Sequence, residues 1–104
     1  MTPAECIAFL DEMLEQYGET VALRRGVTTA TVRASVRGMR AEELIGTAKT
    51  NDLMVVISPT GMNAYGLPKV NDKIVVKSVE RQVKFVDPIY VNDVWVRCNL
   101  VVAG

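Results

Sequence analysis

Residues Asn51 to Lys77 read NDLMVVISPTGMNAYGLPKVNDKIVVK and contain two β-branched runs separated by turn-forming residues. The first run is Leu53 to Ile57 and closes on Ser58-Pro59, and the second, Ile74 to Val76, follows Asn71-Asp72. Short apolar runs bounded by Gly, Pro, Asn and Asp are typical of buried strands joined by irregular connections. No pattern of reactive residues lies in this stretch, so we interpret it as architectural.

The residues before Gly18 predict an amphipathic helix. Thr2 and Glu5 are spaced as a capping box, and Pro3 suits the first helical turn. Apolar residues then recur at spacings of three and four, and Gly18 follows as a stop. We expect a helix over residues 3–17 whose apolar stripe faces the core; the alternative is a docking face for a partner. The stripe consists of Ile7, Leu10, Met13, Leu14 and Tyr17.

Alternation of apolar and polar residues predicts two strands between this helix and the opening stretch, over residues 19–24 and 29–37. In the second strand, Arg33 and Arg37 share the polar face. A solvated sheet face is the simplest interpretation of these arginines. The alternative is a contact with acidic neighbours in an assembly, or with nucleic acid.

Two more strands are predicted after the opening stretch. Residues 79–86 carry Val83 and Phe85 on one face, and we interpret Asp87-Pro88 as a break. Residues 94–102 alternate strictly after a turn at Asn92-Asp93. Their inward face is expected to hold Val94, Val96, Cys98, Leu100 and Val102, and their outward face Trp95, Arg97, Asn99 and Val101.

Residues 38–52, GMRAEELIGTAKTND, match neither a strand nor a lasting helix. Connections this long without strong structure are uncommon in a small domain and tend to be functional or disordered. Leu44 and Ile45 are apolar but have no evident face to bury. We expect a protruding arm that orders on a partner, and the alternative is a loose hairpin tip.

These elements predict a mainly β (α+β) protein with a single domain over residues 1–104. A chain of this length is too short to divide into two cores. We expect one N-terminal helix and about six antiparallel strands. Such strands would curl into a small barrel or sandwich, because closure limits exposed strand edges.

The composition narrows the function classes. Hydrophobic residues make up 49% and charged residues 23%, as in soluble globular proteins. Twelve basic and twelve acidic residues cancel, which disfavours a freestanding nucleic-acid binder. Cys6 and Cys98 are far apart, and we interpret them as apolar fillers in a reducing compartment. No apolar run has the length of a membrane span, and the acidic N-terminus lacks a secretory leader.

Little chemistry is predicted for this chain. It has no histidine, which removes the commonest general base and metal ligand. Asp87 and Asp93 are best interpreted as turn residues, and Gly61 and Gly66 match neither a P-loop nor a dinucleotide fingerprint. We therefore expect no enzyme activity, no catalytic residue, no cofactor and no metal site.

The order of these parts resembles the small head-tail connector proteins of tailed bacteriophages and prophages, of the head-completion or stopper type. The resemblance covers most of the chain from about Val21 onward. It is carried by Val36-Arg37-Gly38, Glu42-Glu43-Leu44-Ile45-Gly46, Val55-Val56-Ile57-Ser58-Pro59-Thr60, Gly66-Leu67-Pro68, Val70-Asn71-Asp72-Lys73-Ile74 and Val86-Asp87-Pro88.

The resemblance implies a virion structural protein at the head-tail interface, made in the bacterial cytoplasm. Such proteins are β-barrels that form a homo-oligomeric ring, of six- or twelve-fold symmetry, beneath the portal and its adaptor. The ring closes the head after packaging and docks the tail terminator or tail-tube protein. Double-stranded DNA would pass through its channel without sequence-specific contact, and no membrane is involved.

Two loops are expected to make contacts in such a ring, although the resemblance does not say which one lines the channel. The arm and the basic strand face would form a subunit or partner interface through Arg33, Arg37, Arg40, Glu42, Glu43, Leu44, Ile45 and Lys49. A second loop, which would face the channel or the tail, carries Thr60, Met62, Asn63 and Tyr65.

Two alternatives remain open at this point. A tail terminator or a minor tail protein belongs to the same class, because small barrels with long loops recur in phage tails. An OB-like module that binds single-stranded nucleic acid belongs to another class. Tyr90 and Trp95 could stack on bases, but they are not interleaved with a basic cluster.

Overall fold

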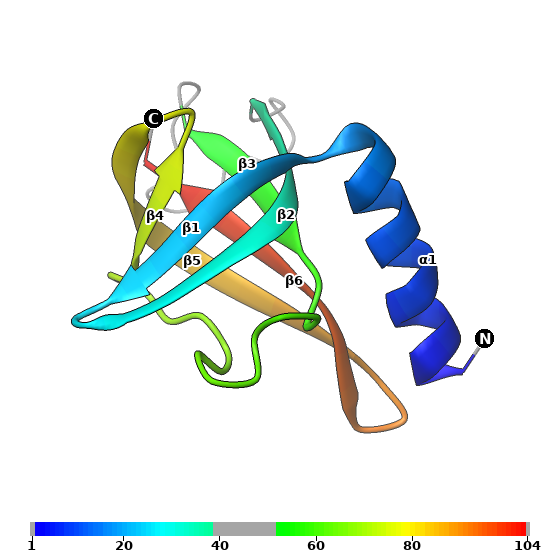
Figure 1. Cartoon of the computed structure of the whole chain (residues 1–104). Coiled ribbons are helices and arrows are strands. Elements are labelled where there is room, and N and C mark those ends of the chain that lie inside the picture. Colours follow the sequence, from blue (N-terminus) through cyan, green and yellow to red (C-terminus); the bar gives the residue numbers. More distant parts are fainter. Residues whose placement is uncertain (1, 39–51, 104) are drawn as a thin grey trace.

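The computed structural model describes residues 2–38 and 52–103, and Figure 1 shows one helix beside a curled sheet. Within these residues the strands form a closed antiparallel barrel in the order β1-β2-β3-β6-β5-β4. The prediction of a mainly β fold with an N-terminal helix is therefore confirmed. The elements are α1 (Pro3–Tyr17), β1 (Glu19–Arg25), β2 (Thr28–Gly38), β3 (Leu53–Ile57), β4 (Lys73–Val76), β5 (Val79–Val91) and β6 (Val94–Val102).

Two-residue turns join β4 to β5 and β5 to β6. Both residues of each turn have positive φ: 51° and 66° at Lys77 and Ser78, and 49° and 63° at Asn92 and Asp93. Turns of this kind match the right-handed twist of the flanking strands. Asn92-Asp93 tolerates the left-handed conformation and was predicted as a turn, whereas Lys77-Ser78 carries no such signal in its residue types.

The barrel interior is filled by inward-facing side chains from all six strands. The alternation predicted for residues 19–24 and 29–37 is confirmed, because Val21, Leu23, Val32 and Ala34 are buried there. Each fully buried Val, Leu or Ile side chain stabilises the fold by roughly 1.5–3 kcal/mol. The rest of the core consists mainly of Val55, Ile57, Ile74, Val76, Val83, Cys98, Leu100 and Val102.

The predicted break at Asp87-Pro88 is wrong, because β5 continues through both residues to Val91. β4 pairs with β5 only as far as Gln82, and Pro88 pairs in register with Cys98 of β6. Pro88 therefore lies where β5 has a ladder partner on one side. A missing N–H is tolerated in such an edge position.

Val83 and Phe85 were predicted to share a face, and this prediction is also wrong. Val83 is fully buried, whereas Phe85 is 60% exposed. The register shifts between them, so Lys84 is an extra residue in β5 opposite the continuous pair Val101 and Val102. Such a β-bulge moves every later side chain to the other face.

A second register shift between β5 and β6 exchanges the inward and outward faces at the start of β6. Ile89 pairs with Arg97 and Tyr90 with Trp95, which leaves Val96 as the extra residue. Val96, predicted to face inward, lies against α1 outside the barrel, and Val94 is exposed. Trp95, predicted to face outward, packs against the core. After this shift, Cys98, Leu100 and Val102 point inward as predicted. Val101 faces outward but is still buried, and its partners in the neighbouring strands are Met54 and Phe85.

Two long connections leave β3 at its opposite ends. Residues 58–72 follow Ile57 and pass across one end of the barrel, where Met62 and Tyr65 are buried in the core (Figure 1). The other connection enters β3 from Gly38, which pairs in register with Leu53. The predicted arm, residues 38–52, lies almost entirely outside the described residues.

α1 lies on the outside of the barrel against β2 and β6 (Figure 1). Its predicted bounds and its capping box at Thr2 and Glu5 are confirmed. Of the predicted stripe, however, only Leu14 is fully buried, and Met13 and Tyr17 are exposed. The prediction that the stripe faces the core is therefore correct for Leu14 and wrong for Met13 and Tyr17.

Candidate functional site

An open groove of about 430 Å³ runs between α1 and the outer barrel wall. The helix contributes Phe9, Met13 and Tyr17, which are 57%, 44% and 77% exposed. Val56 of β3 and Val96 of β6 form part of the floor, and Ile89, Val91 and Cys6 also line the groove. Exposed apolar side chains gathered in one place mark surfaces that bind other molecules.

Arg33 of β2 holds the C-terminal end of α1 in place. Its guanidinium donates hydrogen bonds to three carbonyl oxygens, of Leu14 at 3.3 Å, Glu15 at 3.1 Å and Gly18 at 2.6 Å. The Leu14 oxygen also accepts from the Gly18 backbone amide at 2.9 Å, whereas Glu15 belongs to the last helical turn, whose carbonyl oxygens lack following N–H groups of the helix. A cation at this end also interacts favourably with the helix dipole.

Gly18 is needed because the chain passes very close to β2. A Cβ atom at this position would lie 2.5 Å from the carbonyl oxygen of Leu14 and 2.7 Å from that of Ala34. Its φ of −87° is ordinary, so the requirement is steric rather than conformational. The predicted helix stop is thus correct, but close approach, rather than left-handed geometry, selects glycine.

A second contact ties α1 to the connection after β3. The Thr60 hydroxyl donates to the Asp11 carboxylate at 2.6 Å. The Thr60 backbone amide in turn donates to the Ser58 hydroxyl at 3.2 Å. α1 is therefore held to the barrel at two places, and its outer apolar residues are left uncovered.

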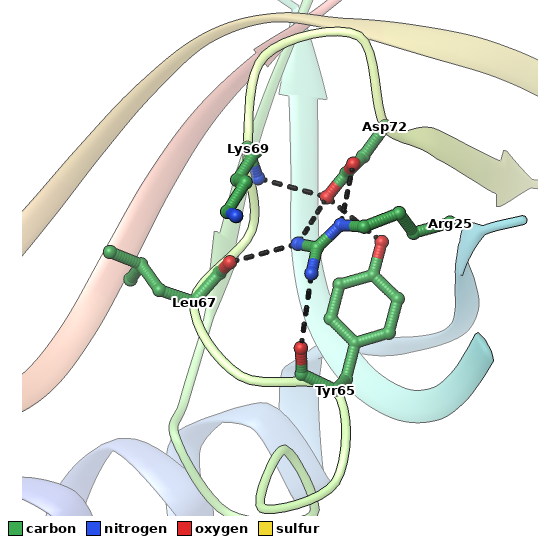
Figure 2. A network of polar contacts seen from close by, with 5 residues as sticks. All are labelled: Arg25, Tyr65, Leu67, Lys69 and Asp72. Carbon is green, nitrogen blue, oxygen red and sulfur yellow. Dashed lines mark hydrogen bonds and ion pairs between the residues drawn. The ribbon is translucent and has the colours of Figure 1, made fainter.

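Residues 58–72 are fastened to the end of β1 by a polar network (Figure 2). Arg25 forms an ion pair with Asp72 at 2.8 Å and donates to the carbonyl oxygens of Tyr65 and Leu67. The Tyr65 hydroxyl and the Lys69 backbone amide also donate to Asp72, each at 2.9 Å. The Arg25 guanidinium lies 4.5 Å from the Tyr65 ring centroid, which adds a cation–π contact.

The environment of the network changes the pKa of each member. Burial, followed by the contact with Asp72, raises the pKa of Tyr65 to about 12. Burial also acts to raise the pKa of Asp72, but hydrogen bonds from Arg25, Lys69 and Tyr65 outweigh it and hold that pKa below its usual range. The hydrogen bond with Asp72 raises the pKa of Arg25. Near neutral pH, Arg25 and Asp72 are therefore charged and the Tyr65 hydroxyl keeps its proton. We interpret the network as one that holds residues 58–72 in place.

The other titratable groups of the described ranges show no arrangement for metal binding. Across residues 2–38 and 52–103, no three His, Cys, Asp or Glu side chains come together as metal ligands. Cys98 is fully buried, and burial, with the nearby Asp87, raises the pKa of its thiol to about 12. A buried thiol of this kind is a poor nucleophile. In the same two ranges, no helix is long and apolar enough to cross a membrane.

The structure places some of the predicted interface residues and not others. Arg33 is engaged at the end of α1, and Arg37 donates to the carbonyl oxygen of Gly38 at 3.1 Å. The remaining members lie outside the described residues, so a contact between the basic strand face and the arm stays a prediction. These members are Arg40, Glu42, Glu43, Leu44, Ile45 and Lys49.

The second predicted loop divides into exposed and buried residues. Thr60 and Asn63 are exposed, as contact with a channel or a tail would require. Met62 and Tyr65 are only 1% and 4% exposed, because they fill the end of the barrel. Their side chains are therefore unavailable to a partner, and that part of the prediction is corrected.

Two features of the site were missed from the sequence. Asp72 was interpreted only as a turn residue and no contact was predicted for Arg25, although together they anchor a whole connection. An acidic residue followed directly by a buried strand was the available signal. The groove was missed because Val96 and Ile89 reach it only through a β-bulge.

Comparison of the chain with protein-family models, with curated proteins and with solved structures finds no match.

Proposed function

We propose that this protein is a structural component of a tailed-bacteriophage particle, of the head-completion or stopper type. In this role it forms a six- or twelve-fold ring below the portal or adaptor, holds the packaged DNA in the head, and receives the tail. The motifs from Val21 onward that resemble this family support the assignment. The protein would then reside in the virion, at the head-tail interface.

The observation that carries the proposal is the apolar groove on a closed barrel. Phe9, Met13 and Tyr17 remain exposed beside it. The barrel closes where β1 pairs with β4 over residues 22–24. We assign the association to the apolar side chains on the outer wall, because they are gathered there and exposed.

The barrel also offers distinct surfaces toward its two ends. Residues 58–72 follow the Ile57 end of β3, and the opposite end of β3, at Leu53, pairs with Gly38 at the end of β2. In a ring that sits between head and tail, one of the two connections to β3 would meet a neighbour above or below, and the other would meet a subunit or the channel. Thr60 and Asn63 are the exposed side chains of residues 58–72 that we assign to such contacts.

Single-strand nucleic-acid binding is the weaker alternative. Phe85 and Tyr90 are exposed on β5, as stacking on bases would need. However, several basic side chains of the described residues are neutralised by acidic partners. These ion pairs are Arg24–Glu80, Arg25–Asp72, Lys77–Glu19 and Lys84–Asp52.

The test is co-sedimentation of the purified protein with DNA-filled, tailless heads, followed by addition of tails. We expect the protein to bind the heads, to reduce DNA leakage, and to allow tails to join. Met13→Glu, which places a charge in the groove, should reduce joining. Val27→Glu is the matched control, because Val27 is fully exposed at the β1–β2 turn.

Each other result has a definite meaning. Binding to isolated tails but not to heads would move the protein to the tail terminator or minor tail class. Binding to neither would refute the phage assignment. Salt-sensitive binding to single-stranded oligonucleotides, lost in Tyr90→Ala, would then favour the nucleic-acid alternative.

A further inference from the structure

The groove and the β4–β5 hairpin lie on opposite walls of the barrel. α1 packs against β2 and β6, so it lies over the wall centred on β3. In the barrel order, β4 is three places from β3 in either direction. Figure 1 shows the helix on one side of the molecule and β4 on the other.

These two walls carry opposite charges. α1 holds four acidic residues and no basic residue, a net charge of −4, and its members are Glu5, Asp11, Glu12 and Glu15. Residues 69–84, which contain β4 and its turns, hold five basic residues against two acidic ones, a net charge of +3. The basic ones are Lys69, Lys73, Lys77, Arg81 and Lys84, and the acidic ones are Asp72 and Glu80. The neutral chain is therefore polarised across the barrel.

Both walls also carry uncovered apolar side chains. The groove side has Phe9, Met13 and Tyr17. At the two ends of β4, Val70 is 52% exposed and Val79 is 50% exposed. In the sequence, Lys73 of β4 lies between these two valines, and on α1 acidic residues such as Glu12 are next to apolar ones such as Met13.

We infer that the groove beside α1 binds the β4–β5 hairpin of a second copy of this chain. Val79 of that copy would contact the groove between α1 and Ile89, and its lysines would face the α1 carboxylates. Each copy uses two different walls, so the contact is heterologous and repeats from copy to copy into a closed ring or an open chain. The inference deepens the proposed ring function and rests on it only for ring closure.

The first experiment is a charge swap, read by sedimentation velocity at low salt and increasing protein concentration. One variant, Glu12→Lys with Glu15→Lys, brings the net charge of the helix wall from −4 to 0, and another, Lys69→Glu with Lys73→Glu, brings that of the hairpin wall from +3 to −1. We expect wild-type association to weaken about tenfold or more in each variant, because the first loses the attraction between the walls and the second replaces it with repulsion. An equimolar mixture of the two variants should associate again.

The chain that carries all four substitutions separates this contact from the effect of net charge. It is neutral, like the wild type, and the new lysines at 12 and 15 are complementary to the new glutamates at 69 and 73, so we expect it to associate with itself more strongly than either two-substitution variant. Val27→Lys with Thr28→Lys adds charge at the exposed β1–β2 turn and should leave association within about twofold of wild type. Association unchanged in both two-substitution variants would overturn the inference, as would failure of the four-substitution chain to recover.

A covalent trap tests the same contact directly. Cys6 lines the groove, so Val79→Cys should give a ladder of dimers, trimers and larger species under mild oxidation. Cys98 is buried and does not compete. When Cys6→Ser is added, only dimers through residue 79 remain possible. A ladder that does not depend on Cys6, or no species beyond dimers in Val79→Cys, would overturn the inference.

Tailless heads distinguish failure of this contact from failure of the proposed function. If wild-type protein binds heads and joins tails while both two-substitution variants do so equally well, the ring stands but uses other surfaces. If wild-type protein ignores heads and tails while the charge swap and the trap succeed, the contact stands and the phage assignment falls.

Discussion

The Asp72 carboxylate receives two hydrogen bonds from the Arg25 guanidinium, 3.0 Å from Nε to Oδ1 and 2.8 Å from Nη2 to Oδ2. This two-point contact joins the end of β1 to a connection that is 40 or more residues later in the chain. Tyr65 and the amide of Lys69 complete the ring of donors around the same carboxylate. The position of the connection across the barrel end therefore depends on one acidic side chain.

Asp72→Ala should lower the free energy of unfolding by about 2 kcal/mol, because it leaves the Arg25 and Tyr65 donors without their acceptor. The Arg25 side chain is 34% exposed, which lets water replace part of the loss. Urea denaturation followed by tryptophan fluorescence measures the change. Arg24→Ala is the matched control: it removes the exposed pair with Glu80 and should cost under about 1 kcal/mol. Equal losses in both variants would contradict the anchoring role.

The Asp72 contribution should also depend on pH. A carboxyl group with a lowered pKa in the folded state binds protons more readily in the unfolded state, so its stabilisation is complete at neutral pH. It declines as the pH falls through the usual value of about 4 and on to the lower folded pKa. We therefore expect the stability gap between wild type and Asp72→Asn to be largest near pH 7 and to narrow at acidic pH. Urea titrations at several pH values test this, and a constant gap would contradict it.

Gly18→Ala should destabilise the protein by about 1–3 kcal/mol, because the new methyl group meets two backbone oxygens that cannot move independently. α1 would have to shift away from β2, so its amides should also exchange hydrogen faster. Gly38→Ala is the matched control, since a Cβ there meets nothing within 4 Å. Thermal unfolding and hydrogen exchange provide the two measurements, and equal behaviour of both variants would contradict the close approach.

The two thiols should react at very different rates. Cys6 is partly exposed at the groove, whereas Cys98 is buried in the core with its thiol pKa raised to about 12. Ellman's reagent should therefore modify one thiol per chain under native conditions and two in urea. Cys6→Ser should abolish the native reaction. Rapid modification of Cys98 in the folded protein would show that the barrel opens there.

Local patterns were sufficient to predict the helix, the strand count and most of the core. The capping box at Thr2, the alternation around Val32 and the turn at Asn92-Asp93 each depend on residues close together in the chain. Such signals act within one element, so they can be detected without knowing its neighbours.

The faces of β5 and β6 could not be predicted in the same way. An extra residue at Lys84 and another at Val96 arise from how two strands pair, and neither residue type marks a bulge. Once the register shifts, the face of every following side chain changes. The error at Phe85, Trp95 and Val96 is therefore one of pairing and not of residue preference.

The candidate site was even harder to predict than the strand faces, because it is formed by contacts between segments that are far apart in the sequence. Arg33 was predicted on a polar strand face, which is correct, but its use at the end of α1 requires knowing where the helix packs. Asp72 and Arg25 are 47 residues apart and meet only in the closed barrel. The position of Asp72 directly before a buried strand is a local signal, but nothing in the local sequence of either residue identifies the other as its partner.

The way Arg33 holds α1 has a consequence for how this protein can evolve. Its hydrogen bonds to the end of α1 go only to carbonyl oxygens, of Leu14, Glu15 and Gly18, which every amino acid supplies; a further one, at 3.4 Å, goes to the Thr20 hydroxyl of β1. The exposed positions of the helix, such as Phe9, Met13 and Tyr17, can therefore be exchanged without loosening its attachment. Recognition and folding are thus encoded in separate atoms of one helix, so a lineage can change what this surface recognises while the barrel beneath it is preserved.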